Sequence, residues 1–224
     1  MKKTNRYIGN GEEIYKELEK VSYSIGFHNI FSDWIDLILN SLLSLTENIT
    51  KENFMEKLKR NKLGGRYEKR YLGITEKYKS DKKIGERPID YLCSAWINLL
   101  KETIKKQEDI LGEIYMQKIT RGEAGQFFTP THITNMMAEM VSEIKGKVSD
   151  PCCGSGRFLI SASKKNKNAE FHGIDLDDRC VKMCAINMWI FNLNAKIKLG
   201  DSLSNKFYKQ YIIKKGGYIY ETDL

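Results

Sequence analysis

Three aspartates, each placed where a short apolar segment ends, are the residues of this sequence that could bind a ligand together. Asp150 runs directly into a glycine loop at 151–156, Asp175 follows that loop by about twenty residues, and Asp201 ends a third apolar segment. In open α/β sheets, ligands bind beyond the carboxyl ends of the strands, which is where such carboxylates would lie.

The spacing of the glycines and the second acid indicates which class of ligand could bind. Gly154 and Gly156 allow positive φ angles and leave no Cβ between the backbone and a ligand. Asp175 stands where a carboxylate accepts hydrogen bonds from both ribose hydroxyls of a nucleoside. A lone Gly-x-Gly also fits a tight turn, and a lone acid also fits a helix cap. Their combination in one order predicts a nucleotide-type pocket.

The elements needed to position these residues follow from the hydrophobic pattern. Strands are predicted at 147–150, 170–175 and 195–199, with helices at 157–164 and 178–191 between them. Strands that alternate with helices indicate parallel βαβ units and a sheet covered on both faces. Two further strands, 207–213 and 217–221, are joined by a Lys-Lys-Gly-Gly hairpin signal. We expect this hairpin to cover the open side of the first strand; otherwise that exposed edge would invite a partner or self-association.

The first half of the chain reads as helical. Apolar residues at three- and four-residue spacing predict a helix around 34–42, Thr50 could cap a helix from Lys51, and Pro88 could start one that continues to Ile104. The segment 109–119 predicts one more helix. The charged segment 59–83 is expected to be a loop or an interrupted helix, and the surface of a basic patch. The fold class is therefore α/β, with a helical domain at 1–120 followed by an α/β domain at 121–224.

Four motifs in one order resemble a known family. They are Gly-Gln-Phe-Phe-Thr-Pro at 125–130, the loop 150–156, Gly-Ile-Asp at 173–175 and Gly-Asp at 200–201. This order is similar to that of the adenine-specific DNA amino-methyltransferases, and most of all to the modification subunit of type I restriction systems. A segment like Leu-Gly-Glu-Ile-Tyr at 111–115 also precedes the Phe-Phe-Thr-Pro motif there. The resemblance covers about 109–204 and implies a class I, Rossmann-like methyltransferase domain that binds S-adenosylmethionine.

The resemblance also implies a role for each motif residue. The methionine carboxylate of the cofactor would be held by Thr129 and the backbone around Phe128, although core packing is the alternative for Phe127 and Phe128. The methionine end and the sugar would be wrapped by Asp150 and the loop with Cys152, Gly154 and Gly156. The ribose hydroxyls would bind Asp175, the adenine ring would pack on Leu176, and the adenine amine would bond Asp201.

One motif of that family is not found in this sequence. The family orients the target amine with Asn, Asp or Ser followed by Pro-Pro and an aromatic residue, which stacks on the flipped base. The three prolines here, Pro88, Pro130 and Pro151, are never adjacent. The residues after Asp201 are also fewer than the usual further strands require. We therefore expect a truncated methyltransferase domain and assign no catalytic residue.

Composition adds expectations about partners and setting. The formal net charge of +8 favours an anionic partner such as DNA. Five cysteines, with Cys152 and Cys153 adjacent, fit neither a secreted disulfide framework nor usual zinc spacing, so we expect a reducing cytoplasmic setting and no metal. No apolar run is long enough to span a membrane.

Three functions remain open at this point. The first is a cofactor-binding relative without autonomous catalysis, in a DNA modification or replicon system. The second is an active DNA adenine methyltransferase completed by non-standard residues or by a catalytic or specificity partner subunit. The third is a basic DNA-binding protein with a vestigial cofactor fold. A homo-oligomer is compatible with each.

Overall fold

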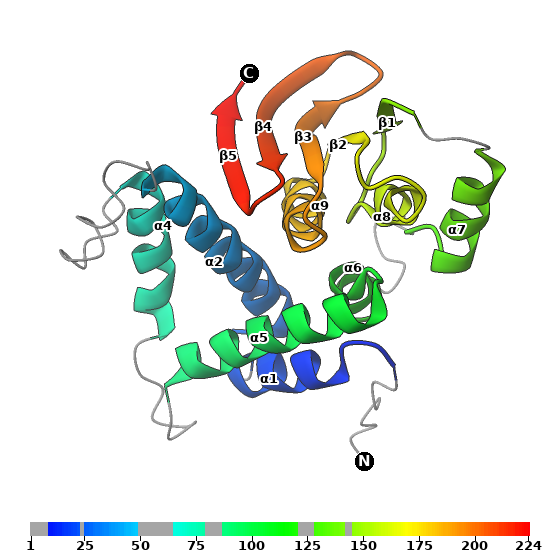
Figure 1. The fold of residues 1–224 in the computed structure, drawn as a ribbon. Helices are drawn as coiled ribbons and strands as arrows, with labels where there is room; N and C mark the ends of the chain where they lie inside the picture. Colours follow the sequence, from blue (N-terminus) through cyan, green and yellow to red (C-terminus); the bar gives the residue numbers. More distant parts are fainter. Residues whose placement is uncertain (1–8, 23–24, 49–64, 79–86, 121–127, 142–144) are drawn as a thin grey trace.

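The computed structural model describes residues 9–22, 25–48, 65–78, 87–120, 128–141 and 145–224. Figure 1 shows a sheet with helices gathered on one side of it. The α-helices are α1 (Glu12–Ser22), α2 (Phe27–Asn48), α4 (Arg66–Thr75), α5 (Pro88–Lys106), α6 (Ile110–Tyr115), α7 (Thr131–Met140), α8 (Arg157–Ser163) and α9 (Asp178–Ile190). The strands are β1 (Lys147–Asp150), β2 (Glu170–Asp175), β3 (Asn194–Asp201), β4 (Lys206–Lys214) and β5 (Tyr218–Asp223).

Helices α2 and α5 form around the apolar stripes that predicted them, whereas α1 was not predicted as a separate helix. In α2, Trp34 is 1% exposed and its indole N–H donates to the carbonyl of Leu92 in α5 at 3.0 Å. Helix α5 begins at Pro88, which fills the first position without losing a hydrogen bond, and ends at Gln107 in the left-handed conformation. The predicted helix at 109–119 is α6, continued by one π-helical turn at Met116–Thr120.

The charged segment 59–83 contains an ordered helix rather than only a loop. Helix α4 packs on α2 and buries Tyr67, and a short 3₁₀ turn follows at Glu76–Tyr78. Arg70 donates from Nη1 to Glu221 Oε2 of β5 at 2.7 Å, so α4 is joined to the sheet. The remaining parts of this segment, and the predicted helix start at Thr50 and Lys51, lie outside the described residues.

In the described part of the chain the sheet has the order β1-β2-β3-β4-β5. The first three strands are parallel, and β4 and β5 form the predicted hairpin. The expected position of that hairpin was wrong, because β4 pairs antiparallel with β3 and leaves one side of β1 open. Only the residues 202–205 separate β3 from β4, so the chain turns back beside the strand it has just left instead of crossing to the far edge.

The prediction of a sheet covered on both faces was also wrong for the residues that the structure describes. Right-handed crossovers that move in one direction place α8 and α9 on the same face, and α2 extends this layer over β5. Phe171 and Ile197 point into this layer and are fully buried, while neighbouring polar residues point to the other face. The strands alternate between apolar and polar residues, which is typical of a sheet with one solvated face.

The helices and the sheet share one continuous cluster of buried apolar residues. It runs from Ile14 in α1 through Trp34 and Ile186 to Ile219 in β5. The division of the chain at residue 120 remains a prediction. Among the described helices, none is long and apolar enough to cross a membrane.

Candidate cofactor site

The three aspartates singled out in the sequence end three neighbouring parallel strands. Asp150 is the last residue of β1, Asp175 of β2 and Asp201 of β3. Asp150 pairs with Gly173 and Asp175 with Leu199 in the strand register. The fold therefore brings the predicted acids to one edge of the sheet, where ligands bind in open α/β folds.

The structure gives a reason for the glycines in the loop 151–156 that the sequence did not reveal. Gly154 and Gly156 have φ angles of 52° and 87°, in the left-handed region. A Cβ at Gly154 would lie 2.9 Å from Phe128 Cε1, and a Cβ at Gly156 would lie 2.7 Å from Cys184 Sγ. These absent side chains make room for neighbouring protein groups, so the loop is drawn tightly against the 128–130 segment and α9.

Asp175 connects the glycine loop to the start of α9. Its Oδ2 accepts from the Gly154 amide at 2.8 Å, and its Oδ1 accepts from the Asp177 amide at 2.9 Å. Each carboxylate oxygen can accept a second hydrogen bond, so both can still receive a hydroxyl. Leu176, directly after it, is 71% exposed and offers an apolar surface beside the carboxylate.

Asp150 is a half-buried acid close to a second acid. Its Oδ1 accepts from the Cys152 amide at 3.1 Å. Burial raises the pKa of Asp150, the charge of Asp175 raises it further, and the Cys152 amide opposes the shift. A cationic ligand group at this position would relieve both the burial cost and the repulsion. The Cys152 thiol is exposed, whereas Cys153 is buried and its amide donates to the Ile174 carbonyl at 2.8 Å.

Asp201 has a local structural role in the turn that follows it. One oxygen accepts from the amide of Leu203 at 2.8 Å, and the other accepts from the Ser204 hydroxyl at 2.8 Å. The hydrogen bond from the Ser204 hydroxyl, followed by those from the backbone amides, lowers the pKa of this carboxyl. Asp201 thereby shapes the turn into β4, and a role toward an adenine amine stays a prediction.

The Phe-Thr segment lies against the glycine loop. The ring of Phe128 stacks on Tyr115 with centroids 5.5 Å apart, and its amide donates to Met116 Sδ at 3.3 Å. Thr129 is exposed, and its carbonyl accepts from Arg157 Nη1 at 3.2 Å. Core packing, the alternative foreseen for Phe128, is thus part of what this residue does. Gly125, Gln126 and Phe127 lie outside the described residues.

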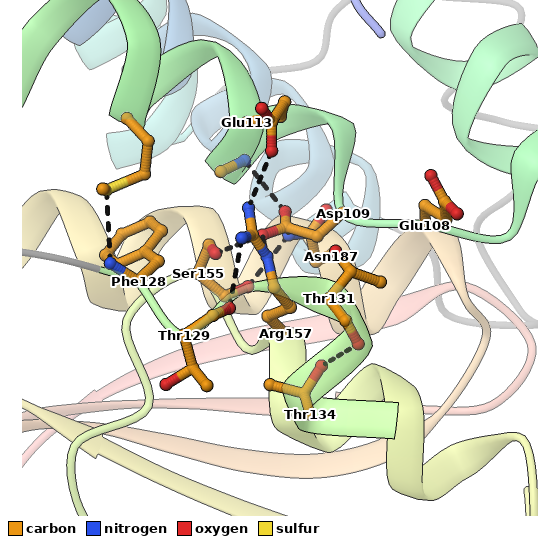
Figure 2. A network of polar contacts seen from close by, with 12 residues as sticks. Glu108, Asp109, Glu113, Phe128, Thr129, Thr131, Thr134, Ser155, Arg157 and Asn187 are labelled. Atoms are coloured by element: carbon orange, nitrogen blue, oxygen red, sulfur yellow. Dashed lines mark hydrogen bonds and ion pairs between the residues drawn. The ribbon is translucent and has the colours of Figure 1, made fainter. Parts of the chain in front are cut away.

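A buried polar network, missed in the sequence, holds these segments together (Figure 2). The Asp109 carboxylate has no exposed surface and caps α6 by accepting from the Gly112 amide at 2.8 Å. It also accepts from Asn187 Nδ2 at 2.8 Å, from Arg157 Nε at 3.2 Å and from the Ser155 hydroxyl. The only sequence signal was an acid before a helix, which also fits an ordinary N-cap.

Arg157 extends this network to the remaining segments. From the first position of α8 it reaches Asp109, the Thr129 carbonyl and Glu113 Oε2, the last at 3.4 Å. Its side chain is 9% exposed. One guanidinium therefore links α6, the 128–130 segment and the glycine loop, which fixes their relative positions.

A cavity of about 420 Å³ lies elsewhere, between α2, α4, α9 and the hairpin. Three of the cations that line it contact neighbouring acids: Arg70 and Lys209 contact Glu221, and Lys182 contacts Asp36. These ion pairs join the helices to the hairpin, which is a structural role, so the strand-end loops remain the candidate site. Within the described ranges, no group of three or more His, Cys, Asp or Glu residues is placed to hold a metal ion.

Comparison with known proteins agrees with the motifs. The N-6 DNA Methylase family matches residues 106–216. The MjaIX methylase subunit of a type I restriction enzyme from Methanocaldococcus jannaschii is 24% identical over 61% of this chain and 27% of its own length. The HindI methylase subunit from Haemophilus influenzae is 31% identical over 50% of this chain and 28% of its own. The MpnII methylase subunit from Mycoplasma pneumoniae is 26% identical over 79% of this chain and 39% of its own length.

These matches confirm the resemblance to adenine-specific DNA methyltransferases. Residues 106–216 are similar to the N-6 DNA methylases, and the chain is similar to the methylase subunits of type I restriction enzymes. It spans about a quarter to two fifths of the length of these three relatives. No solved structure matches the chain.

Proposed function

We propose that this chain binds S-adenosylmethionine at the loops after β1, β2 and β3, as the cofactor-binding part of a DNA adenine methyltransferase. One observation carries the proposal. The strand-end acids Asp150 and Asp175 and the glycine loop meet at one sheet edge, inside the segment that matches the N-6 DNA Methylase family. That family uses S-adenosylmethionine as the methyl donor.

The residues at this edge fit the chemical groups of the cofactor. S-adenosylmethionine carries an ammonium group, which would neutralise the Asp150 carboxylate that burial and Asp175 disfavour. Asp175 would accept from the ribose hydroxyls with its free lone pairs, and the exposed Leu176 would cover the adenine ring. Thr129, Cys152 and the backbone of the loop would surround the methionine end. Asp201 would meet the adenine amine with the lone pairs that its bonds to Leu203 and Ser204 leave free.

We further propose that the isolated chain holds the cofactor without transferring its methyl group. None of its three prolines is adjacent to another, so the Pro-Pro loop that orients a target amine is not among these 224 residues. The groups that orient the base would come from a specificity or catalytic partner subunit or from non-standard residues. Relatives named as methylase subunits of restriction enzymes support DNA as the substrate and other subunits as partners.

Calorimetric titration with S-adenosylmethionine tests the cofactor site. We expect one-site micromolar binding, weakened tenfold or more in Asp175→Ala, which corresponds to about 1.4 kcal/mol. Asp178→Ala is the matched control, because its carboxylate contacts Lys182 on α9 instead of the loop, and its affinity should not change. No binding at millimolar cofactor, or equal loss in both variants, would overturn the proposed site.

Transfer of a labelled methyl group to adenine-containing DNA tests the second statement. We expect no incorporation by the chain alone. Incorporation that disappears in Asp150→Ala would show that the chain is an autonomous methyltransferase.

A further inference from the structure

The face of the sheet opposite the helices is unusual in its side chains. The register places Lys196 and Lys198 of β3 on this face, because their neighbour Ile197 points into the helical layer. By the same alternation, Tyr218 and Tyr220 of β5 lie on it, since Ile219 between them is fully buried. Among the residues that the structure describes, no helix packs on this face.

The charges on this face are unequal. Lys147, Lys196, Lys198 and Lys214 lie on it, and the register adds the single acid Glu170. Glu170 is already paired with Lys196 at 2.8 Å. The remaining lysines give the face a positive potential, which suits an anionic partner.

Aromatic rings accompany these charges. Tyr218 and Tyr220 are 42% and 45% exposed, and Ile212 lies between β3 and Tyr220 in the register. Toward the other end of β4, Lys198 Nζ lies 4.5 Å from the ring centroid of Phe207. Lysines and exposed rings on one face of a sheet match the chemistry that binds single-stranded nucleic acid, in which bases stack on the rings and phosphates meet the cations.

We propose that this sheet face, defined by Lys198, Lys214, Tyr218 and Tyr220, binds single-stranded DNA. Residues two apart on one face of a strand are separated by roughly 6.7 Å, twice the rise per base of a duplex strand. Only an extended, unstacked strand can therefore place neighbouring bases on Tyr218 and Tyr220. A protein partner would favour a contiguous apolar patch, which the lysines interrupt. The inference deepens the proposed function and rests on it only for the choice of DNA.

Fluorescence anisotropy of a labelled single-stranded oligodeoxynucleotide tests the proposal. Stacking contributes about 1–3 kcal/mol per base, so removing two rings in Tyr218→Ala/Tyr220→Ala should lower the affinity about thirtyfold or more. Tyr218→Phe/Tyr220→Phe keeps the rings and should keep the affinity. Both tyrosines are exposed, so circular dichroism should show that each variant remains folded.

The lysines are tested by the dependence of affinity on salt. Lys198→Gln/Lys214→Gln should reduce the slope of log affinity against log salt by about 1.4, at about 0.7 for each lost phosphate contact. Lys101→Gln/Lys105→Gln, which removes two exposed charges from the helical side, should leave this slope unchanged. Equal effects of the two pairs, or duplex binding as tight as single-strand binding, would overturn the proposal.

Two further outcomes are decisive. If Tyr218→Ala/Tyr220→Ala changes the mass in sedimentation but not the affinity for DNA, the face is a protein contact and the proposal is wrong. The tyrosine variant should also bind S-adenosylmethionine as well as the unchanged chain does. A chain that binds single-stranded DNA through these tyrosines but never binds the cofactor would overturn the proposed function alone.

Discussion

Removal of the Asp109 carboxylate should cost more stability than any exposed acid in this chain. Its side chain is fully buried and accepts four hydrogen bonds, one of them from the Arg157 guanidinium. In Asp109→Ala the Arg157 charge loses its main partner, while Ser155 and Asn187 each lose an acceptor. Glu113 lies 3.4 Å from Arg157 Nη2 and is itself 34% exposed, so it can compensate only in part.

The magnitude follows from the loss of one partner of a buried ion pair, which costs about 3–5 kcal/mol. The lost helix cap contributes about 1 kcal/mol within that range instead of adding to it. For a chain of this size, 1 kcal/mol corresponds to roughly 2–4 °C in melting temperature. We therefore expect Asp109→Ala to lower the melting temperature by roughly 6–20 °C.

Urea unfolding followed by circular dichroism measures the loss of unfolding free energy, and thermal melting measures the shift in melting temperature. Asp90→Ala is the matched control, because Asp90 pairs with Arg87 on the surface with both side chains more than half exposed. Its loss should cost about 0–1 kcal/mol. The Asp109→Ala variant should also bind S-adenosylmethionine more weakly, because Ser155 of the glycine loop loses its partner.

A double-mutant cycle decides whether the ion pair is the cause. Arg157→Met removes the charge that Asp109→Ala leaves unpaired. The double variant should therefore lose less unfolding free energy than the two single variants lose together, by about 0.5–3 kcal/mol. A loss below 1 kcal/mol in Asp109→Ala, or strictly additive losses, would refute this reasoning.

Two other variants separate stability from binding. The pKa of Asp150 is raised in the folded protein by burial and by Asp175, so its contribution to stability falls as the pH rises above the ordinary value of 3.8. Thermal melting should therefore show that Asp150→Asn is more stable than the unchanged chain near neutral pH, with a smaller gain in acid. Calorimetry should show that the same variant binds the cofactor more weakly. An unchanged melting temperature at neutral pH would contradict this expectation. Gly154→Ala places a Cβ 2.9 Å from Phe128 at a φ of 52° and should cost about 1–3 kcal/mol, whereas Gly73→Ala in α4, with open space around it, should be neutral or stabilising. Equal effects in the two glycine variants would argue against a tight fit of the loop.

The arrangement of the candidate cofactor site was largely predictable because its signals are local. A strand end, a glycine turn and an acid at fixed spacing are set by a few neighbouring residues, so Asp150, Gly154 and Asp175 could be placed at one sheet edge before the fold was known. The roles assigned to them remain predictions. Asp201 shows the limit of this approach, since its bonds to Leu203 and Ser204 depend on the turn that follows it.

The network around Asp109 could not be read from the sequence. Asp109 lies 46 positions before Ser155 and 78 positions before Asn187 in the sequence, although it accepts a hydrogen bond from each. Each of the three residues also has an ordinary local explanation. A turn, a cap and a polar position on a helix become one network only after packing. Nothing in the local pattern distinguishes a buried capping acid from an exposed one.

The sequence by itself determined the alternation of strands and helices from β1 to β3, the three acids at the strand ends and the family resemblance, because these depend on short-range pattern. Tertiary structure alone decided that the hairpin joins β3, that the helices lie on one face, and that Tyr218 and Lys198 are left on the other. The alternation of polar and apolar residues in β2 and β3 already carried part of this information. The handedness of crossovers and the length of connections decide which strand a hairpin pairs with and which face of the sheet remains open. Both factors act between elements and not within them.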